Sequence, residues 1–112
     1  MPELQDAALL RIYIGDDDTY HEQPLAEAIV RAARDAGLAG ATVLRGMLGF
    51  GRSAHVHEIH KGFSHDLPVV VEIVDEPAAI EAWLPVLEDM NMLRAGVVVV
   101  ERVQIARFHS RS

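Results

Sequence analysis

The residues best suited to chemistry are three glycines bracketed by two arginines. Arg45 and Arg52 enclose Gly46, Gly49 and Gly51 in the segment RGMLGFGR. Glycine lets a backbone approach a ligand closely, and arginine binds phosphate or carboxylate through two parallel hydrogen bonds. A polar loop follows instead of a helix, and no Gly-Lys-Ser/Thr occurs, so neither a dinucleotide fingerprint nor a P-loop is present. Two interpretations stay open: an anion-binding turn, and a β-bulge at a strand exit with no ligand.

A histidine-rich segment, HVHEIH, follows the glycines. His55 and His57 would share one face of an extended strand, a geometry suited to zinc, copper or nickel. His60 would point to the other face, so completing a site requires a bend or help from Glu58 or His65. The alternative is a solvated loop whose histidines titrate near neutral pH. Because no fourth ligand stands at a fixed spacing, the metal site is the less favoured interpretation.

Catalytic groups are few. DDDTY, residues 16–20, lacks the spacing and central glycine of a calcium loop, so a polar turn is favoured over a cation site. There is no cysteine, and no serine stands in a nucleophile-elbow motif. Glu72 and Glu101 lie in apolar surroundings, where a perturbed pKa or an ion pair with a nearby arginine is expected. We therefore expect a protein that is not an enzyme.

Size and charge restrict the class of protein. The 112 residues predict a single domain, 1–112, and a net charge of −7 disfavours nucleic acid or an anionic membrane as the main partner. The longest apolar runs are too short to span a bilayer, so no direct membrane insertion is expected. The N-terminal residues show no basic stretch followed by an apolar one, so we expect a cytoplasmic protein.

The hydrophobic periodicity indicates six main elements. Alternation predicts strands over 8–15, 41–47, 67–75 and 97–108, and apolar stripes predict helices from Leu25 to Gly37 and around Trp83. Pro85 is expected to kink or split the second helix, and residues 1–7 and 109–112 are expected to be frayed. The order β-α-β-β-α-β predicts an α+β, ferredoxin-like sandwich, with an antiparallel four-stranded sheet and two helices on one face.

The second face of that sheet should also be covered. Leu9 and Tyr13 fall on the face away from the helices, and residues 97–100 are all valine. The third strand is apolar on both sides except for Glu72. Strands that are apolar on both sides are usually buried on both sides. We therefore expect another copy of the chain to cover this face.

The same residues carry a family resemblance. AGLAGATVLRGMLGFGR resembles the PII signalling proteins around their second strand, and DLPVVVEIVDEP is similar to the strand after their T-loop. Over nearly its whole length the chain resembles the PII-like domain-of-unknown-function group numbered 190, through LLRIYIG, DLPVVVEIVD, WLPVLEDMN and ERVQI. The resemblance implies a homotrimer with small-molecule ligands, such as adenine nucleotides, in three clefts between subunits. It also implies a T-loop-like segment, 52–66, that signals to a partner.

The resemblance also assigns site residues. Gly40 to Thr42 match the stretch that meets adenine, Gly51 and Arg52 match the start of the T-loop, and Arg107 matches an arginine that contacts phosphates. The PII phosphate loop is replaced by MNMLRAGV, so a smaller nucleotide or another anion is implied. The full expected ligand-binding set is Gly40, Ala41, Thr42, Arg45, Gly49, Gly51, Arg52, His57 and Arg107.

Two expectations concern partners. Members of this family are often encoded beside fluoride exporters, which implies a membrane transporter as the regulated partner. The alternative is a divalent-metal-binding trimer, similar to the divalent-cation tolerance proteins, with His55 and His57 as ligands.

Overall fold

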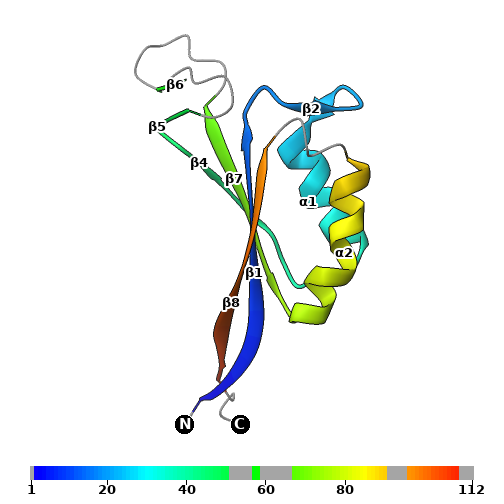
Figure 1. The fold of residues 1–112 in the computed structure, drawn as a ribbon, viewed down its shortest axis with the longest axis vertical. Coiled ribbons are helices and arrows are strands. Elements are labelled where there is room, and N and C mark those ends of the chain that lie inside the picture. The colour runs from blue at the N-terminus through cyan, green and yellow to red at the C-terminus, as the bar shows by residue number, and fades with distance from the viewer. Residues whose placement is uncertain (1, 51–56, 59–66, 91–95, 109–112) are drawn as a thin grey trace.

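A computed structural model describes residues 2–50, 57–58, 67–90 and 96–108. Its main sheet has four antiparallel strands in the order β4-β7-β1-β8, and both helices lie on one side of it (Figure 1). The predicted α+β, ferredoxin-like sandwich is confirmed. The elements are β1 Glu3–Gly15, β2 Thr19–Tyr20, β3 Gln23–Pro24, α1 Leu25–Asp35, β4 Thr42–Arg45, β5 Leu48–Gly49, β6 His57–Glu58, β7 Pro68–Asp75, α2 Pro77–Asp89 and β8 Val97–Arg107.

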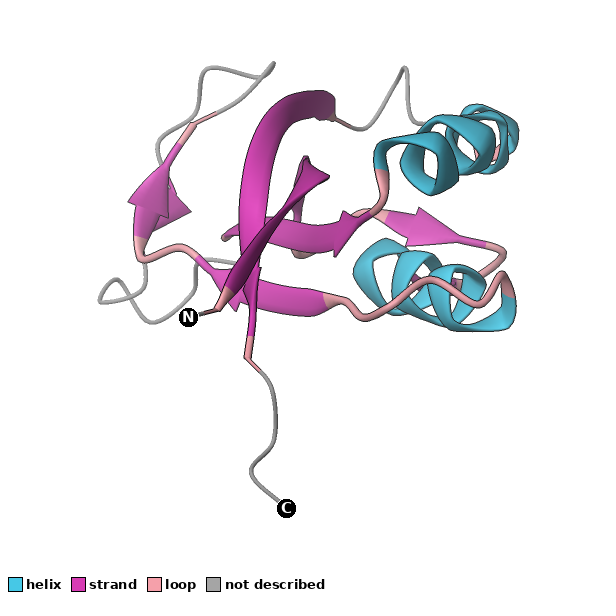
Figure 2. Cartoon of the chain, turned by 90° about the horizontal axis from the view of Figure 1, so that it is seen from below, coloured by secondary structure: helices cyan, strands magenta, loops and turns pink. Residues whose placement is uncertain are grey.

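The core lies between the helices and one face of β1 and β7. From Ala8 to Ile14, the even-numbered residues of β1 point to the helices, and they pair directly with odd-numbered residues of β7 that share the same face. Figure 2 shows the helical layer on a single side of the sheet. The apolar stripes predicted for both helices are buried here, which confirms them. The core includes Leu10, Ile12, Ile14, Leu25, Ile29, Val69, Val71, Ile73, Ile80, Trp83 and Leu87.

The first strand is longer than its alternation predicts. It begins at Glu3, and residues 3–7, for which we expected fraying, pair with residues 103–107 of β8. The ladder with β7 starts only at Ala8, so the first part of β1 and the last part of β8 form a two-stranded arm. In Figure 1 this arm carries both termini away from the rest of the sheet. Pairing satisfies the backbone of the arm, which explains its order. Residues 109–112 lie outside the described part.

The polar segment before α1 contains a small hairpin. Thr19 pairs with Pro24, and Tyr20 pairs with Gln23. The two residues between them, His21 and Glu22, have φ angles of 50° and 66°. This is the left-handed region, which side chains other than glycine, asparagine and aspartate rarely adopt. The predicted turn is therefore a hairpin with a strained tip.

The second helix passes through its proline without splitting. Pro85 lies inside α2, which runs without interruption from Pro77 to Asp89. The hydrogen bond that proline cannot donate would have gone to the carbonyl of Glu81. Both residues are exposed, so water can satisfy that carbonyl. Of the two expected effects of Pro85, a kink or a split, the split does not occur.

Three glycines lie where a neighbouring segment leaves little or no room for a side chain. A Cβ atom on Gly46 would lie 2.6 Å from Cγ of Pro68, and one on Gly49 would lie 3.0 Å from the same atom. A Cβ on Gly96 would lie only 1.9 Å from the carbonyl oxygen of Tyr13. The absence of side chains at these positions lets the exit of β4 lie close to β7 and the entry of β8 lie close to β1.

We expect Gly96→Ala to destabilise the protein by about 3 kcal/mol, because the backbone of β1 must move to admit the methyl group. Urea unfolding followed by circular dichroism at fixed protein concentration measures this loss. Gly40→Ala is the matched control, since its added Cβ meets nothing within 4 Å, and its effect should stay within about 0.5 kcal/mol. Equal stability of the two variants would contradict the proposed close approach.

Candidate functional site

The end of β4 carries the first group of predicted site residues. Arg45 pairs across the ladder with Val69, and its Nη1 donates to Asp16 Oδ2 at 2.9 Å. The Arg45 side chain is 58% exposed. An ion pair this exposed contributes little to stability. Arg45 therefore stands at the surface, and its role as a ligand-binding residue stays a prediction.

The glycine cluster has a packing role. The N–H of Gly46 donates to the carbonyl oxygen of Pro68, and both Gly46 and Gly49 lie against the Pro68 ring. Gly49 pairs with His57 where β5 meets β6, so the backbones of these two predicted site residues are neighbours. Among the described glycines only Gly37 has a positive φ, so Gly46 and Gly49 do not form a left-handed anion turn. Gly51, Arg52 and His55 lie outside the described residues.

The approach to β4 holds the predicted adenine-contacting residues. Ala39 N–H donates to Asp75 Oδ2 at 2.9 Å, while Asp75 Oδ1 accepts from the N–H of Glu76 at 2.7 Å. One carboxylate thus fixes both the chain before β4 and the start of α2. Gly40 is exposed and Ala41 is half-buried, with open space above Gly40 in this chain. The contact of Asp75 with Ala39 joins segments that are distant in sequence.

Arg107 lies on the opposite edge of the sheet. Its Nε donates to Gln5 Oε1 at 3.0 Å within the arm. Across the sheet, Thr42 pairs with Glu72, Glu72 with Arg11, and Arg11 with Val99. Three strand spacings therefore separate Thr42 from β8, about 14 Å. Arg107 is eight residues further along β8, roughly 26 Å at strand rise. One chain does not bring these residues together.

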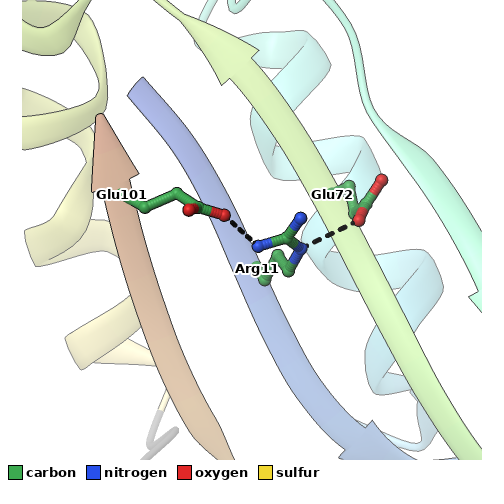
Figure 3. A network of polar contacts seen from close by, with 3 residues as sticks. All are labelled: Arg11, Glu72 and Glu101. Atoms are coloured by element: carbon green, nitrogen blue, oxygen red, sulfur yellow. Dashed lines mark hydrogen bonds and ion pairs between the residues drawn. The ribbon is translucent and has the colours of Figure 1, made fainter. Parts of the chain in front are cut away.

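A charged triad crosses the sheet face that the helices leave open (Figure 3). Arg11 donates from Nε to Glu72 Oε2 at 3.1 Å and from Nη1 to Glu101 Oε1. The prediction that Glu72 and Glu101 pair with a nearby arginine is confirmed. The partner was not identifiable from the sequence, because the strand register decides it. Apolar residues share this face: Leu9, Tyr13, Leu44, Val70, Val74, Val97 and Val99.

Several of these apolar side chains are not covered within the chain. Tyr13 is 43% exposed, and Val97 to Val100 are 37–59% exposed. The last strand is thus apolar on both faces and open on both. Without a partner, the apolar side chains around the Arg11 triad would stay exposed to water as one contiguous surface.

The acidic turn does not form a cation site in the described residues. Asp16 binds Arg45, and Asp18 Oδ2 accepts from the N–H of Gly15 at 2.8 Å. In the ranges that the structure describes, no three histidine, aspartate or glutamate side chains are grouped for a metal. His55 falls outside those ranges, and only the backbone of His57 is described. No described helix is long and apolar enough to cross a membrane.

Comparison with known proteins gives consistent similarities. The DUF190 family model, described as "Uncharacterized ACR, COG1993", matches residues 7–105. A UPF0166 protein of Aquifex aeolicus (strain VF5) is 34% identical over 99 residues, which are 87% of this chain and 90% of the relative.

Solved structures of PII-like proteins have the same fold. CPII from Thiomonas intermedia K12, a nitrogen regulatory PII-like protein bound to ADP, AMP and bicarbonate, has a TM-score of 0.70 at 21% identity. The alignment covers 94% of this chain and 92% of CPII. A candidate PII-like signaling protein from Thermus thermophilus has a TM-score of 0.68 at 15% identity, with 92% of each chain covered.

The triad generates a prediction about pH. Hydrogen bonds to Glu101 first and to Glu72 second raise the pKa of Arg11, so its contribution to stability is lost only as pH rises through that raised pKa. In the Arg11→Lys variant this loss of stability begins at a pH that can be studied, because an ordinary lysine titrates near pH ~10.4. The variant should therefore lose stability relative to wild type as pH rises above about 10. Urea unfolding at pH 8 and at pH 10.5 compares the two proteins.

Arg102→Lys serves as the control for the pH prediction. Arg102 neighbours Glu101 on β8 but pairs with Ala8 on the helix side. Its substitution should leave the pH dependence of unfolding unchanged. The same alkaline loss in both variants would show that the triad is not its cause.

Proposed function

This chain belongs to the DUF190 family, and we propose that it is a PII-like regulatory protein that binds a small anionic ligand between neighbouring copies of itself. An adenine nucleotide is the proposed ligand, with Gly40 to Thr42 at the base and Arg107 at the phosphates. The likeness to CPII bound to ADP, AMP and bicarbonate supports this choice. We propose binding and signalling, with no catalysis, as its activity.

The proposal rests on one observation: the predicted site residues lie at opposite edges of the sheet. Gly40 to Thr42 belong to the β4 edge, and Arg107 belongs to the β8 edge, with β7 and β1 between them. A ligand that contacts both sets cannot do so within one chain at the separations given above. In a cyclic assembly the β4 edge of one copy would meet the β8 edge of the next, and one site would form at each contact.

The open sheet face supports the same assembly. Its valines, together with Leu9 and Tyr13, would be buried if the sheets of several copies faced one another. We propose three copies. The Arg11 triad would then lie inside the assembly, where a paired and hydrogen-bonded cation is tolerated but an unpaired charge is not.

The proposal also includes the cellular location of the protein and the partner that it regulates. We propose that the protein acts in the cytoplasm and that 52–66 transmits the ligand state to a membrane transporter. The divalent-metal interpretation with His55 and His57 remains the alternative, and no described contact favours it. A ligand screen that includes ADP, AMP, bicarbonate and Zn²⁺ separates the two, since a ligand at 100-fold its Kd adds about 2.7 kcal/mol of stability.

A mixing experiment tests the shared site. Gly40→Leu fills space that is open in the single chain and should block the base, while Arg107→Ala removes the phosphate contact. Loss of a charged hydrogen bond costs about 1.5–3 kcal/mol, so ADP affinity measured by calorimetry should fall by about 10- to 100-fold in the Arg107→Ala protein. The Gly40→Leu protein should show no measurable ADP binding.

Subunits of the two variants, unfolded together and refolded as a mixture, should regain sites. Random mixing joins an intact β4 edge to an intact β8 edge in about one contact in four. The mixture should therefore bind ADP at wild-type affinity with about a quarter of the wild-type stoichiometry. A mixture that shows no sites of wild-type affinity, and only the weak binding of the Arg107→Ala protein, would place both residues in one chain's site.

The triad, which the proposed assembly would bury, generates a prediction about the molecular mass of the protein in solution. Arg11→Glu places three carboxylates on the open face and should convert the assembly to monomers, as measured by light scattering after size exclusion. Arg102→Glu makes the same change of net charge on the other side of β8 and should keep the wild-type mass. Loss of assembly in both variants would point to overall charge as the cause.

A further inference from the structure

A groove lies on the helical side of the molecule, away from both the open sheet face and the predicted ligand site. The β2–β3 hairpin, α1 and the C-terminal part of α2 line this groove, which has a volume of about 340 Å³. Figure 1 shows the hairpin at the end of the helical layer where α2 finishes. The groove is open to solvent, which suits a peptide segment more than an enclosed small molecule.

The floor of the groove is apolar, and the short side chains of two alanines leave it deep. Ala28 and Ala32, one helical turn apart on α1, lie opposite Val86 and Met90 of α2. Alanine side chains leave space between the two helices, and Val86 is 36% exposed there. An aliphatic or aromatic side chain of a partner would bury apolar surface on both sides if it entered this space.

The walls of the groove carry negative charge. Asp35 and Asp89 both line it, at the C-terminal ends of α1 and α2. The remaining charged lining residue, Arg31, donates to Glu27 Oε1 at 2.7 Å, so one positive charge stands beside the two aspartates of the lining. Arg34 approaches Asp35 only to 3.6 Å, with both side chains more than 70% exposed.

The end of α2 strengthens this preference for a cation. The C-terminus of a helix carries partial negative charge, which lysine or arginine in the last turn usually offsets. The last turn of α2 has no basic residue and instead carries Glu88 and Asp89. In the part of the chain that the structure describes, no ion pair involves Asp89. A cation supplied from outside would interact favourably with both the carboxylate and the helix end.

The hairpin holds an aromatic edge over the groove. Tyr20 and His21 both line it, and their rings meet edge to face with centroids 4.3 Å apart. His21 reaches this position in the left-handed backbone conformation described above. Backbone strain of this kind is found most often where a side chain is positioned for binding.

We propose that this groove is the docking site for a basic, amphipathic segment of a partner protein. One apolar side chain of the segment sits between Ala32 and Val86, and separate lysine or arginine side chains face Asp35 and Asp89. The negative walls disfavour nucleotides, nucleic acid and anionic lipid as occupants. The groove is separate from the nucleotide site, so docking and nucleotide binding succeed or fail independently.

Selection from a phage library of random 12-residue peptides on the intact protein tests this proposal. Enriched sequences should combine lysine or arginine with leucine, isoleucine or an aromatic residue. Synthetic fluorescein-labelled copies should bind wild type in fluorescence polarisation and bind Asp35→Lys/Asp89→Lys at least tenfold more weakly. Glu81→Lys, an exposed site on α2 outside the groove, is the matched control and should bind like wild type.

Three outcomes would overturn the proposal. They are no enrichment, enrichment of acidic or uncharged peptides, and equal binding to the double variant. A lower mass of the double variant in light scattering would instead assign the groove to a second copy of the chain. Repeating the titration with saturating ADP separates this site from the proposed nucleotide site, because peptide binding should persist whether or not ADP binds.

Two glycine substitutions test the aromatic edge. His21→Gly and Glu22→Gly both place glycine at a left-handed position, and both should raise the urea midpoint. Only His21→Gly removes a lining side chain, so it should weaken the selected peptides several-fold while Glu22→Gly binds them like wild type. Equal affinity in the two variants would remove His21 from the docking surface.

Discussion

Everything in this molecule depends on the fact that two helices cover only one face of a four-stranded sheet. The central strand β1 sends Leu10 and Ile12 into a closed core and sends Leu9 and Tyr13 to the other side. Leu10 and Ile12 are fully buried within the chain, whereas Leu9 and Tyr13 are partly exposed. The closed core is therefore built from the residues of one chain, and the open face is the part of the sheet that the helices leave uncovered.

The fold could be predicted because hydrophobic periodicity determines it locally. Alternation in β1 and the apolar stripes of α1 and α2 were sufficient to give the topology that the structure confirms. The arm formed by residues 3–7 was missed, because cross-strand pairing with β8 orders it and its own side-chain pattern is weak. The β2–β3 hairpin was missed for a related reason, since its turn residues, His21 and Glu22, are unusual in left-handed conformations.

The site was only partly predictable. The sequence drew attention to the glycines near Arg45, but it did not reveal that Pro68 of another strand makes Gly46 and Gly49 necessary. Packing between distant segments leaves no local signal of this kind. The choice of Arg11 as the partner of Glu72 and Glu101 likewise depends on strand register, and a shift of one residue would send it to the other face.

The pairing of Glu3 with Arg107 has a practical consequence for engineering. Their strands are neighbours, so the two ends of the sheet leave the domain side by side. A short linker could join these two ends within one copy, and new ends could be opened in another connection, giving a circularly permuted domain. In such a protein the order of the strands along the chain would change, while their order across the sheet would stay the same.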